Sequence, residues 1–141
     1  MLRQLLVAGA VSVCNIAIHA LVMTAVVRAA QTVAARTTTR SRSLFLMGTM
    51  IVTVSVLMAA HTSEVAVWAL AYALLDAAPP GANHLYFAFV NYTTLGYGDV
   101  LPVPEWQLLG PITAMNGVLL FGWSTAVIFE ILRRAITLRS D

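Results

Sequence analysis

The sequence predicts an all-α membrane protein with three transmembrane helices and a re-entrant helix between the second and the third. Hydrophobic residues make up 60% of the 141 residues and charged residues only 10%, whereas soluble domains are about 25% charged. Three apolar stretches, 2–27, 44–75 and 108–132, each exceed the ~20 residues that a helix needs to cross the hydrocarbon core. A fourth, 84–90, is too short to span and is therefore predicted to enter and return.

The first stretch is interpreted as an extra N-terminal helix, followed by a basic linker that completes the segment 1–43. Its apolar run is much longer than the ~7–15 residues of a signal-peptide core, so we expect a retained helix. The single cysteine, Cys14, lies inside this run and has no second cysteine with which to form an internal disulfide. Its small apolar side chain predicts a packing role.

The rest of the chain is predicted to form one pore-like domain, 44–132, with a short tail at 133–141. Its outer helix, 44–75, would be ~48 Å long if straight, so it must tilt, bend near 61–64 or project from the bilayer. Pro79, Pro80 and Gly81 end this helix. A helix over 83–93 follows, with Asn83 as its N-cap, and an inner helix over 105–132 begins with Pro104 and Glu105 in its first turn. Pro111, further along, is positioned to bend the inner helix.

The arginines predict the orientation of a multi-pass cell-membrane protein. Seven of the eight lie either between the first two stretches or after the third: Arg28, Arg36, Arg40, Arg42, Arg133, Arg134 and Arg139. The positive-inside rule places these segments in the cytoplasm, and with them the C-terminus. The N-terminus is then outside, and the segment between Asp76 and Glu105 faces the external side.

Composition and motifs also exclude some functions. A net charge of +2 is too small and too thinly spread for a nucleic-acid partner. The sequence has no phosphate-binding loop, no nucleophile–base pattern and no Cys/His cluster with metal-ligand spacing, so we expect neither an enzyme nor a bound cofactor.

The segment Thr94-Leu95-Gly96-Tyr97-Gly98 is the most informative part of the sequence. Irregular backbone at membrane depth is tolerated only where it is buried in protein or lines an aqueous path. Glycines at alternate positions permit positive φ, so that successive carbonyls can point the same way. One chain supplies one column of oxygens, and four chains supply stacked rings that replace the water around a monovalent cation. Tyr97 is expected to turn outward and brace the loop against the short helix.

The motif TTLGYGD, residues 93–99, between a short helix and a long one, resembles the pore of tetrameric potassium channels. The chain is more closely similar to small prokaryotic ion-channel proteins that place one extra helix before a two-helix pore. The resemblance implies a homotetramer in the lipid bilayer that conducts K⁺ passively. It further implies a selectivity filter at Thr94–Gly98, K⁺ coordination at Thr94, Leu95, Gly96 and Tyr97, and Asp99 at the outer mouth.

The sequence departs from this family at several positions. Leu95 replaces the usual Val or Ile, Val90 stands where some bacterial channels carry a bracing Glu, and Tyr86 and Phe87 replace a pair of Trp residues. Leu95 leaves open the alternative of a weakly selective cation channel. A separate alternative is a non-conducting pore-like subunit that regulates or assembles with another membrane protein, although the intact Gly-Tyr-Gly favours conduction.

Polar residues inside the spans suggest a support for the filter. His61, Glu64 and Trp68 share one face of the second helix, and a carboxylate inside a span is usually paired. We expect Glu64 and His61 to bond Asn91 or Tyr92 behind the filter, giving the bracing that Val90 cannot. Asn15 and His19 form a second polar pair on the first helix, with His19 in reach of Glu64. The alternative is a structural clamp between helices without effect on conduction.

The inner helix carries residues with two interpretations each. Gly117 and Gly122 are candidates for a gating hinge, although glycine in transmembrane helices also serves close packing. Asn116, Ser124 and Thr125 are candidates for lining a central cavity. Near the end of this helix, Glu130 is expected to pair with Arg133 or Arg134.

Overall fold

The computed structural model describes residues 1–36 and 42–137, and within them every regular element is helical. The elements are α1 (Leu2–Arg36), α2 (Arg42–Leu74), α3 (His84–Tyr92), the 3₁₀ turn η1 (Pro104–Trp106) and α4 (Leu109–Thr137). Three of these helices are long and apolar enough to span a membrane, over Leu2–Thr32, Ser43–Leu74 and Pro104–Arg134. The prediction of an all-helical membrane fold with three spanning helices is therefore confirmed.

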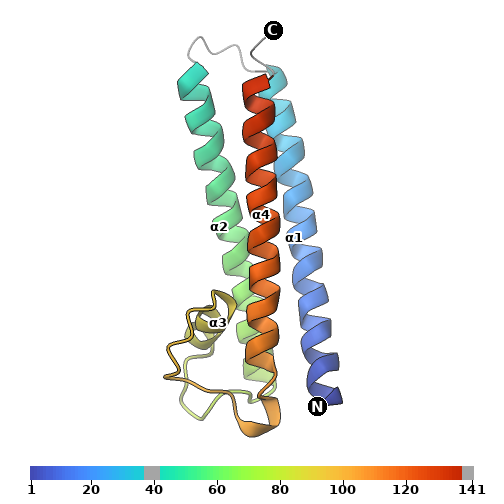
Figure 1. Cartoon of the computed structure of the whole chain (residues 1–141), viewed down its shortest axis with the longest axis vertical. Coiled ribbons are helices and arrows are strands. Elements are labelled where there is room, and N and C mark those ends of the chain that lie inside the picture. Colours follow the sequence, from blue (N-terminus) through green and yellow to red (C-terminus); the bar gives the residue numbers. More distant parts are fainter. Residues whose placement is uncertain (37–41, 138–141) are drawn as a thin grey trace.

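The three long helices form an up–down–up bundle, and α3 packs beside it near one end (Figure 1). The end of α1, the start of α2 and the end of α4 share the opposite end of the bundle, away from the N-terminus and α3. α3 packs against α2 and α4, while α1 packs against the other side of the same two helices. The short helix and the loop that follows it therefore sit at a single end of the molecule.

Several helix boundaries differ from the predicted ones. α1 continues to Arg36, past the end of its apolar stretch, and α2 runs without interruption from Arg42 to Leu74, through 61–64. Pro104 and Glu105 form a separate 3₁₀ turn, and α4 begins only at Leu109. Pro111 is consequently the third residue of α4. The N–H that proline lacks would have no partner within the helix at this position, so no intrahelical hydrogen bond is lost. The bend predicted at this proline has no structural reason to occur.

The short helix α3 has the N-cap that the sequence predicts. The Asn83 side chain accepts a hydrogen bond from the Tyr86 backbone N–H at 3.1 Å. The helix buries Phe87, Ala88, Val90 and Tyr92, which are apolar or aromatic and recur at helical spacing. This inward face fixes which residues of α3 approach the bundle.

A hydrophobic core cluster lies at the α3 end of the bundle. It gathers large side chains from α2, α3, η1 and α4, with Ala8 from α1; among them are Trp68, Tyr72, Phe87, Tyr92, Trp106 and Leu109. The first turn of α1 is fastened to the same region, because Gln4 Oε1 accepts a hydrogen bond from the Leu108 N–H at 2.9 Å. The Arg3 guanidinium also stacks 4.7 Å from the centre of the Trp106 ring.

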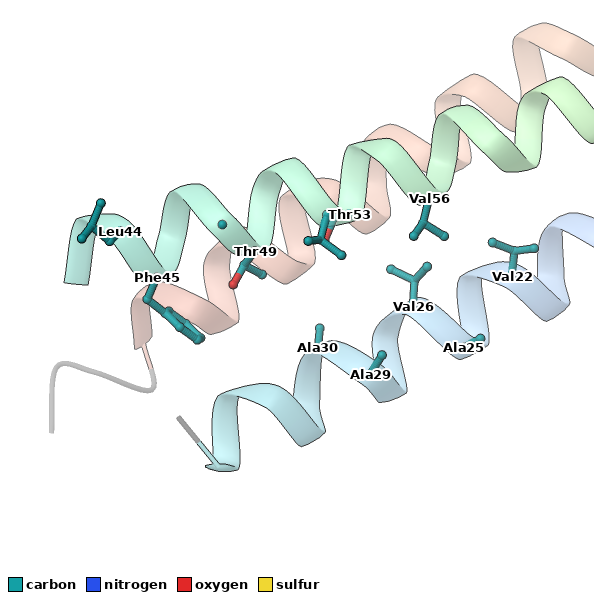
Figure 2. Close-up of a pocket in the computed structure, with 12 residues that line it drawn as sticks. Val22, Ala25, Val26, Ala29, Ala30, Leu44, Phe45, Thr49, Thr53 and Val56 are labelled. Atoms are coloured by element: carbon teal, nitrogen blue, oxygen red, sulfur yellow. The ribbon is translucent and has the colours of Figure 1, made fainter. Parts of the chain in front are cut away.

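Towards the other end, α1 and α2 line a half-open apolar cavity of about 670 Å³. Figure 2 shows small side chains of α1, such as Val26 and Ala30, facing Thr49, Thr53 and Val56 of α2 across this space. Large apolar side chains elsewhere on the spanning helices are exposed, including Ile51 and Phe129. Such surfaces are expected on a protein whose surroundings are lipid.

Candidate functional site

The loop that follows α3 has an alternating backbone. Within residues 94–98, called the TLGYG loop below, φ is +60° at Thr94, +60° at Gly96 and +76° at Gly98. The intervening residues Leu95 and Tyr97 are not among those with positive φ. Positive φ at every second residue is the condition under which successive carbonyl groups face the same side. At Thr94, a residue with a Cβ, this conformation costs about 1–2 kcal/mol, so the surroundings must impose it.

The amide groups of this loop are held by the end of α3. The Thr94 N–H donates to the Asn91 carbonyl at 3.0 Å, and the N–H groups of Leu95 and Gly96 both donate to the Val90 carbonyl, at 3.0 and 3.4 Å. Val90 therefore supports the loop through its main chain, while its side chain is buried. Within the part of the chain that the structure describes, no carbonyl oxygen of residues 94–98 accepts a hydrogen bond.

The side chains of the TLGYG loop lie largely on the surface of the single chain. Leu95 is 52% exposed and Tyr97 is 68% exposed. Within the part of the chain that the structure describes, the Tyr97 ring is not buried, so it is available to pack against another chain. The expectation that Tyr97 braces the loop against the short helix concerns the assembled pore and stays a prediction.

The residue after the loop is anchored to the exposed side of α3. Tyr86 Oη donates a hydrogen bond to Asp99 Oδ2 at 2.6 Å. This bond, together with partial desolvation and the nearby carboxylate charge, raises the pKa of the Tyr86 phenol. The sequence identified Tyr86 only as a departure from the family pattern, and its partner was not predicted.

Behind the loop, the Glu64 carboxylate is fully buried and receives hydrogen bonds from three helices. His19 Nδ1 of α1 lies 2.8 Å from Oε1, and His61 Nδ1 lies 2.9 Å from Oε2. The Tyr92 hydroxyl, at the end of α3, also donates to Oε2, and lies 3.0 Å from His61 Nδ1. The carboxylate thus joins α1, α2 and α3 at one point. Its partner on α3, Tyr92, lies two residues before Thr94.

Ser124 of α4 closes this cluster from the far side of the two imidazole rings. Its Oγ lies 2.9 Å from His61 Nε2 and 3.5 Å from His19 Nε2. The rings are covered by aromatic side chains, since Trp123 lies 5.2 Å from His19 and Phe121 lies 4.6 Å from His61, measured between ring centres. We call His19, His61, Glu64, Tyr92 and Ser124 the Glu64 cluster.

A second polar group fastens α1 and α2 to α4. Asn15 Nδ2 lies within 3.2 Å of both the Glu64 carbonyl and Asn116 Oδ1, and Trp68 Nε1 donates to the same Asn116 oxygen at 3.0 Å. Trp68 therefore reaches α4 and not the TLGYG loop. Asn116 and Ser124 are both buried inside the chain, so the expectation that they line a central cavity is wrong.

Asn91 does not reach Glu64 but begins a separate chain of hydrogen bonds. Its Nδ2 donates to Tyr72 Oη at 3.3 Å, and that hydroxyl lies 2.6 Å from Thr113 Oγ1. Thr113 in turn donates to the Leu109 carbonyl at 2.8 Å, so each hydroxyl donates one bond and accepts one. Tyr72 and Thr113, which the sequence did not single out, thereby connect the end of α3 to α2 and α4.

The two glycines of α4 have different surroundings. A Cβ at Gly117 would overlap the backbone carbonyl of Tyr92, whereas a Cβ at Gly122 has no atom within 4 Å. Gly117 therefore allows the end of α3 to approach α4 closely. Further along α4, Glu130 pairs with both Arg133 and Arg134.

Comparison with known proteins gives one match. Residues 60–134, more than half of the chain, match the family model described as "Ion channel". No curated protein and no solved structure matches the chain. The matched region contains the last part of α2 from residue 60 on, all of α3, the TLGYG loop and most of α4, and it leaves α1 outside.

Proposed function

Because the chain belongs to the ion channel family, we propose that it is a potassium-selective channel in which residues 94–98 of four identical chains form the selectivity filter. Ion channel activity in a multi-pass membrane protein is what the family and the three apolar helices establish. The proposal adds the ion, the pathway and the number of subunits.

The backbone of the TLGYG loop is the observation that carries the proposal. φ is positive at Thr94, Gly96 and Gly98, and the N–H groups of Thr94, Leu95 and Gly96 are engaged by the end of α3. The carbonyl oxygens remain available on the other side. Carbonyl oxygens in stacked rings replace the hydration shell of K⁺, and Asp99 beyond the loop adds negative charge where a cation enters. No cofactor besides the permeant ion is required.

Exposed side chains favour assembly of several chains around an axis. Leu95 and Tyr97 of the loop are more than half exposed, and so are Met115, Val118 and Leu119 of α4. A single chain provides one column of oxygens and no closed path through the bilayer. Fourfold assembly would bring four such columns together and give Tyr97 a neighbouring subunit to pack against.

The arrangement of charges supports the proposed orientation. The C-terminal ends of α1 and α4 lie at the end of the bundle opposite α3 (Figure 1), and these C-terminal parts carry Arg28, Arg133 and Arg134. With this end in the cytoplasm, as the positive-inside rule requires, the N-terminus and Asp99 face the exterior.

Hydrogen bonds at the end of α3 support a bracing role for Glu64 and His61. Tyr92 is bonded to the Glu64 carboxylate, and Asn91 is bonded to Tyr72. These two residues are separated from the TLGYG loop by one residue, so displacing either would move the carbonyl groups of Val90 and Asn91 that bind the N–H groups of Thr94, Leu95 and Gly96. The competing interpretation is a clamp between helices with no effect on conduction. Recordings of Glu64→Gln distinguish the two, because unchanged selectivity and inactivation would refute bracing.

Cation flux into liposomes that contain the purified protein tests the proposed function. We expect K⁺ uptake well above Na⁺ uptake for the wild type and its loss in Gly96→Ala, because alanine is strained at φ +60°. The matched control is Gly9→Ala in α1, where an added Cβ has no atom within 4 Å.

The other possible results of the flux measurement each favour one of the alternative functions. Equal K⁺ and Na⁺ flux would contradict potassium selectivity and indicate a weakly selective cation channel, with Leu95 as the first residue to exchange. Absence of flux from the wild type would contradict conduction by this chain alone and favour a non-conducting subunit.

A further inference from the structure

The Glu64 cluster contains a set of metal-ligating groups that the sequence spacing does not reveal. His19, His61 and Glu64 each place one ligand atom within 4.8 Å of the others. His19 comes from α1 and the other two from α2, so the set is completed by a helix outside the region that matches the ion channel family. We propose that these three residues bind a divalent transition-metal cation, with Zn²⁺ as the best fit.

The donor set and its spacing suit this class of ion. Two imidazole nitrogens and a carboxylate are typical ligands of Zn²⁺. Ligand atoms around a tetrahedral zinc with bonds of ~2.1 Å lie roughly 3.4 Å apart. Here His19 Nδ1 lies 2.8 Å from Glu64 Oε1, and His61 Nδ1 lies 2.9 Å from Glu64 Oε2. Small side-chain rotations that move these atoms apart by a few tenths of an ångström would open the required space.

With both histidines neutral, the hydrogen bonds of this cluster are one proton short, and either an added proton or a metal ion on the Nδ1 atoms makes up the shortfall. If both histidines are neutral and donate from Nδ1 to Glu64, both Nε2 atoms need a donor. The single hydroxyl proton of Ser124 serves only one of them. With a metal ion on the Nδ1 atoms, both Nε2 atoms carry the proton and donate to Ser124 Oγ, which accepts two bonds. A metal-bound histidine usually donates its other N–H in this way.

Charge is also balanced within the cluster. The Tyr92 hydroxyl is bonded to Glu64 Oε2 and is placed to become the fourth ligand. A bound cation favours loss of a proton from a coordinating O–H group, so Glu64 and the Tyr92 phenolate together neutralise a divalent ion. Neutrality matters because Glu64 and His19 are fully buried and His61 is nearly so.

Zinc titration of the purified full-length protein, freed of metal with a chelator and kept in detergent, tests this site. We expect one Zn²⁺ per chain, with release of at least one proton per ion from Tyr92, measured by calorimetry in buffers of different ionisation enthalpy. Affinity should fall as the pH is lowered, because only unprotonated histidines bind a metal ion.

Two variants and a matched control make the test specific. His19→Gln keeps a hydrogen-bonding group but removes a ligand, and should weaken binding at least ~100-fold, beyond the range for outer-shell changes. Ser124→Ala keeps all ligands and removes the group that orients both rings, so a loss of about 10–100-fold is expected. His84→Gln changes the one histidine outside the cluster and should leave the affinity unchanged.

Three results would overturn the proposal. The first is wild-type protein that binds Zn²⁺ no more tightly than His19→Gln. The second is binding that is lost in His84→Gln, which would place the ion on the surface. The third is full affinity in Ser124→Ala together with no proton release. None of these measurements depends on ion conduction, so they stand independently of the proposed channel function.

Discussion

Replacing Gly117 with alanine is expected to displace the end of α3. The added Cβ would overlap the backbone carbonyl oxygen of Tyr92 and lie 3.3 Å from Tyr92 Cδ1. The backbone cannot rotate away as a flexible side chain can, because Tyr92 is also bonded to Glu64 through its hydroxyl. Either α4 moves outward or the last turn of α3 shifts, and in both cases the support of Leu95 and Gly96 by the neighbouring Val90 carbonyl changes.

Comparison with Gly122→Ala isolates the cost of this overlap. Inserting a methyl group into a packed contact costs about 1–3 kcal/mol. The gain in helix propensity from glycine to alanine, up to about 1 kcal/mol, is common to both variants because both positions lie inside α4. Since a Cβ at Gly122 meets no atom within 4 Å, the variants should differ by the overlap alone. The melting temperature of Gly117→Ala, followed by circular dichroism in detergent, should therefore lie about 3–10 °C below that of Gly122→Ala.

Equal melting temperatures for the two variants would refute this reasoning, because they would show that α3 and α4 do not approach at Gly117 as described. Flux measurements add a second criterion. If close packing is the role of Gly117, a smaller effect on flux is expected for Gly122→Ala. If a flexible hinge at Gly122 is what matters, that variant should lose flux while remaining as stable as the wild type or more so.

Three further substitutions test the hydrogen bonds at either side of α3. Tyr72→Phe removes the link between Asn91 and Thr113 and should lower the unfolding free energy by about 1 kcal/mol, measured by thermal denaturation; an unchanged stability would show that the link contributes nothing. Tyr86 should ionise above the ordinary tyrosine pKa of about 10, because its protonated form donates to Asp99. The contribution of that bond to stability is thus present below pH 10 and is lost as the pH rises through the raised pKa of Tyr86. Ultraviolet difference titration against Tyr86→Phe measures this pKa, and Asp99→Asn should bring it back towards 10; no change on that substitution would contradict the assigned cause.

The helices could be predicted because membrane spanning requires long apolar runs and because prolines and glycines interrupt them. The run that ends before Pro79 and the cap at Asn83 are local features, and they appear in the structure as predicted. The start of α4 at Leu109 could not be predicted from the sequence in the same way. A proline followed by a glutamate suits the first turn of an α-helix and of a 3₁₀ turn equally, and only the packing of Trp106 into the core separates them.

The contacts behind the TLGYG loop could be predicted only in part. Intrahelical spacing placed His61 and Glu64 on one face, because residues three apart meet on a helix surface. The rotation of α4 was not available from the sequence, since a helix that faces lipid is apolar on most sides and its polar residues do not identify one buried face. Asn116 and Ser124 were accordingly assigned to a central cavity, whereas they turn towards α1 and α2.

The two hydrogen-bond chains that end on Asn91 and Tyr92 have a mechanical consequence for α3. Consecutive residues of an α-helix project about 100° apart, so the two tethers pull on the helix from different directions. Together with the buried face of α3, each hydrogen-bond chain opposes rotation of the helix about its axis. With both chains in place, rotation of α3 about its axis in either direction stretches one of them. The last turn of α3 is therefore held in orientation as well as in position. Motion of α3 relative to α1, α2 and α4 therefore requires that at least one of these two hydrogen-bond chains breaks first. Otherwise α3 and the helices that support it move together.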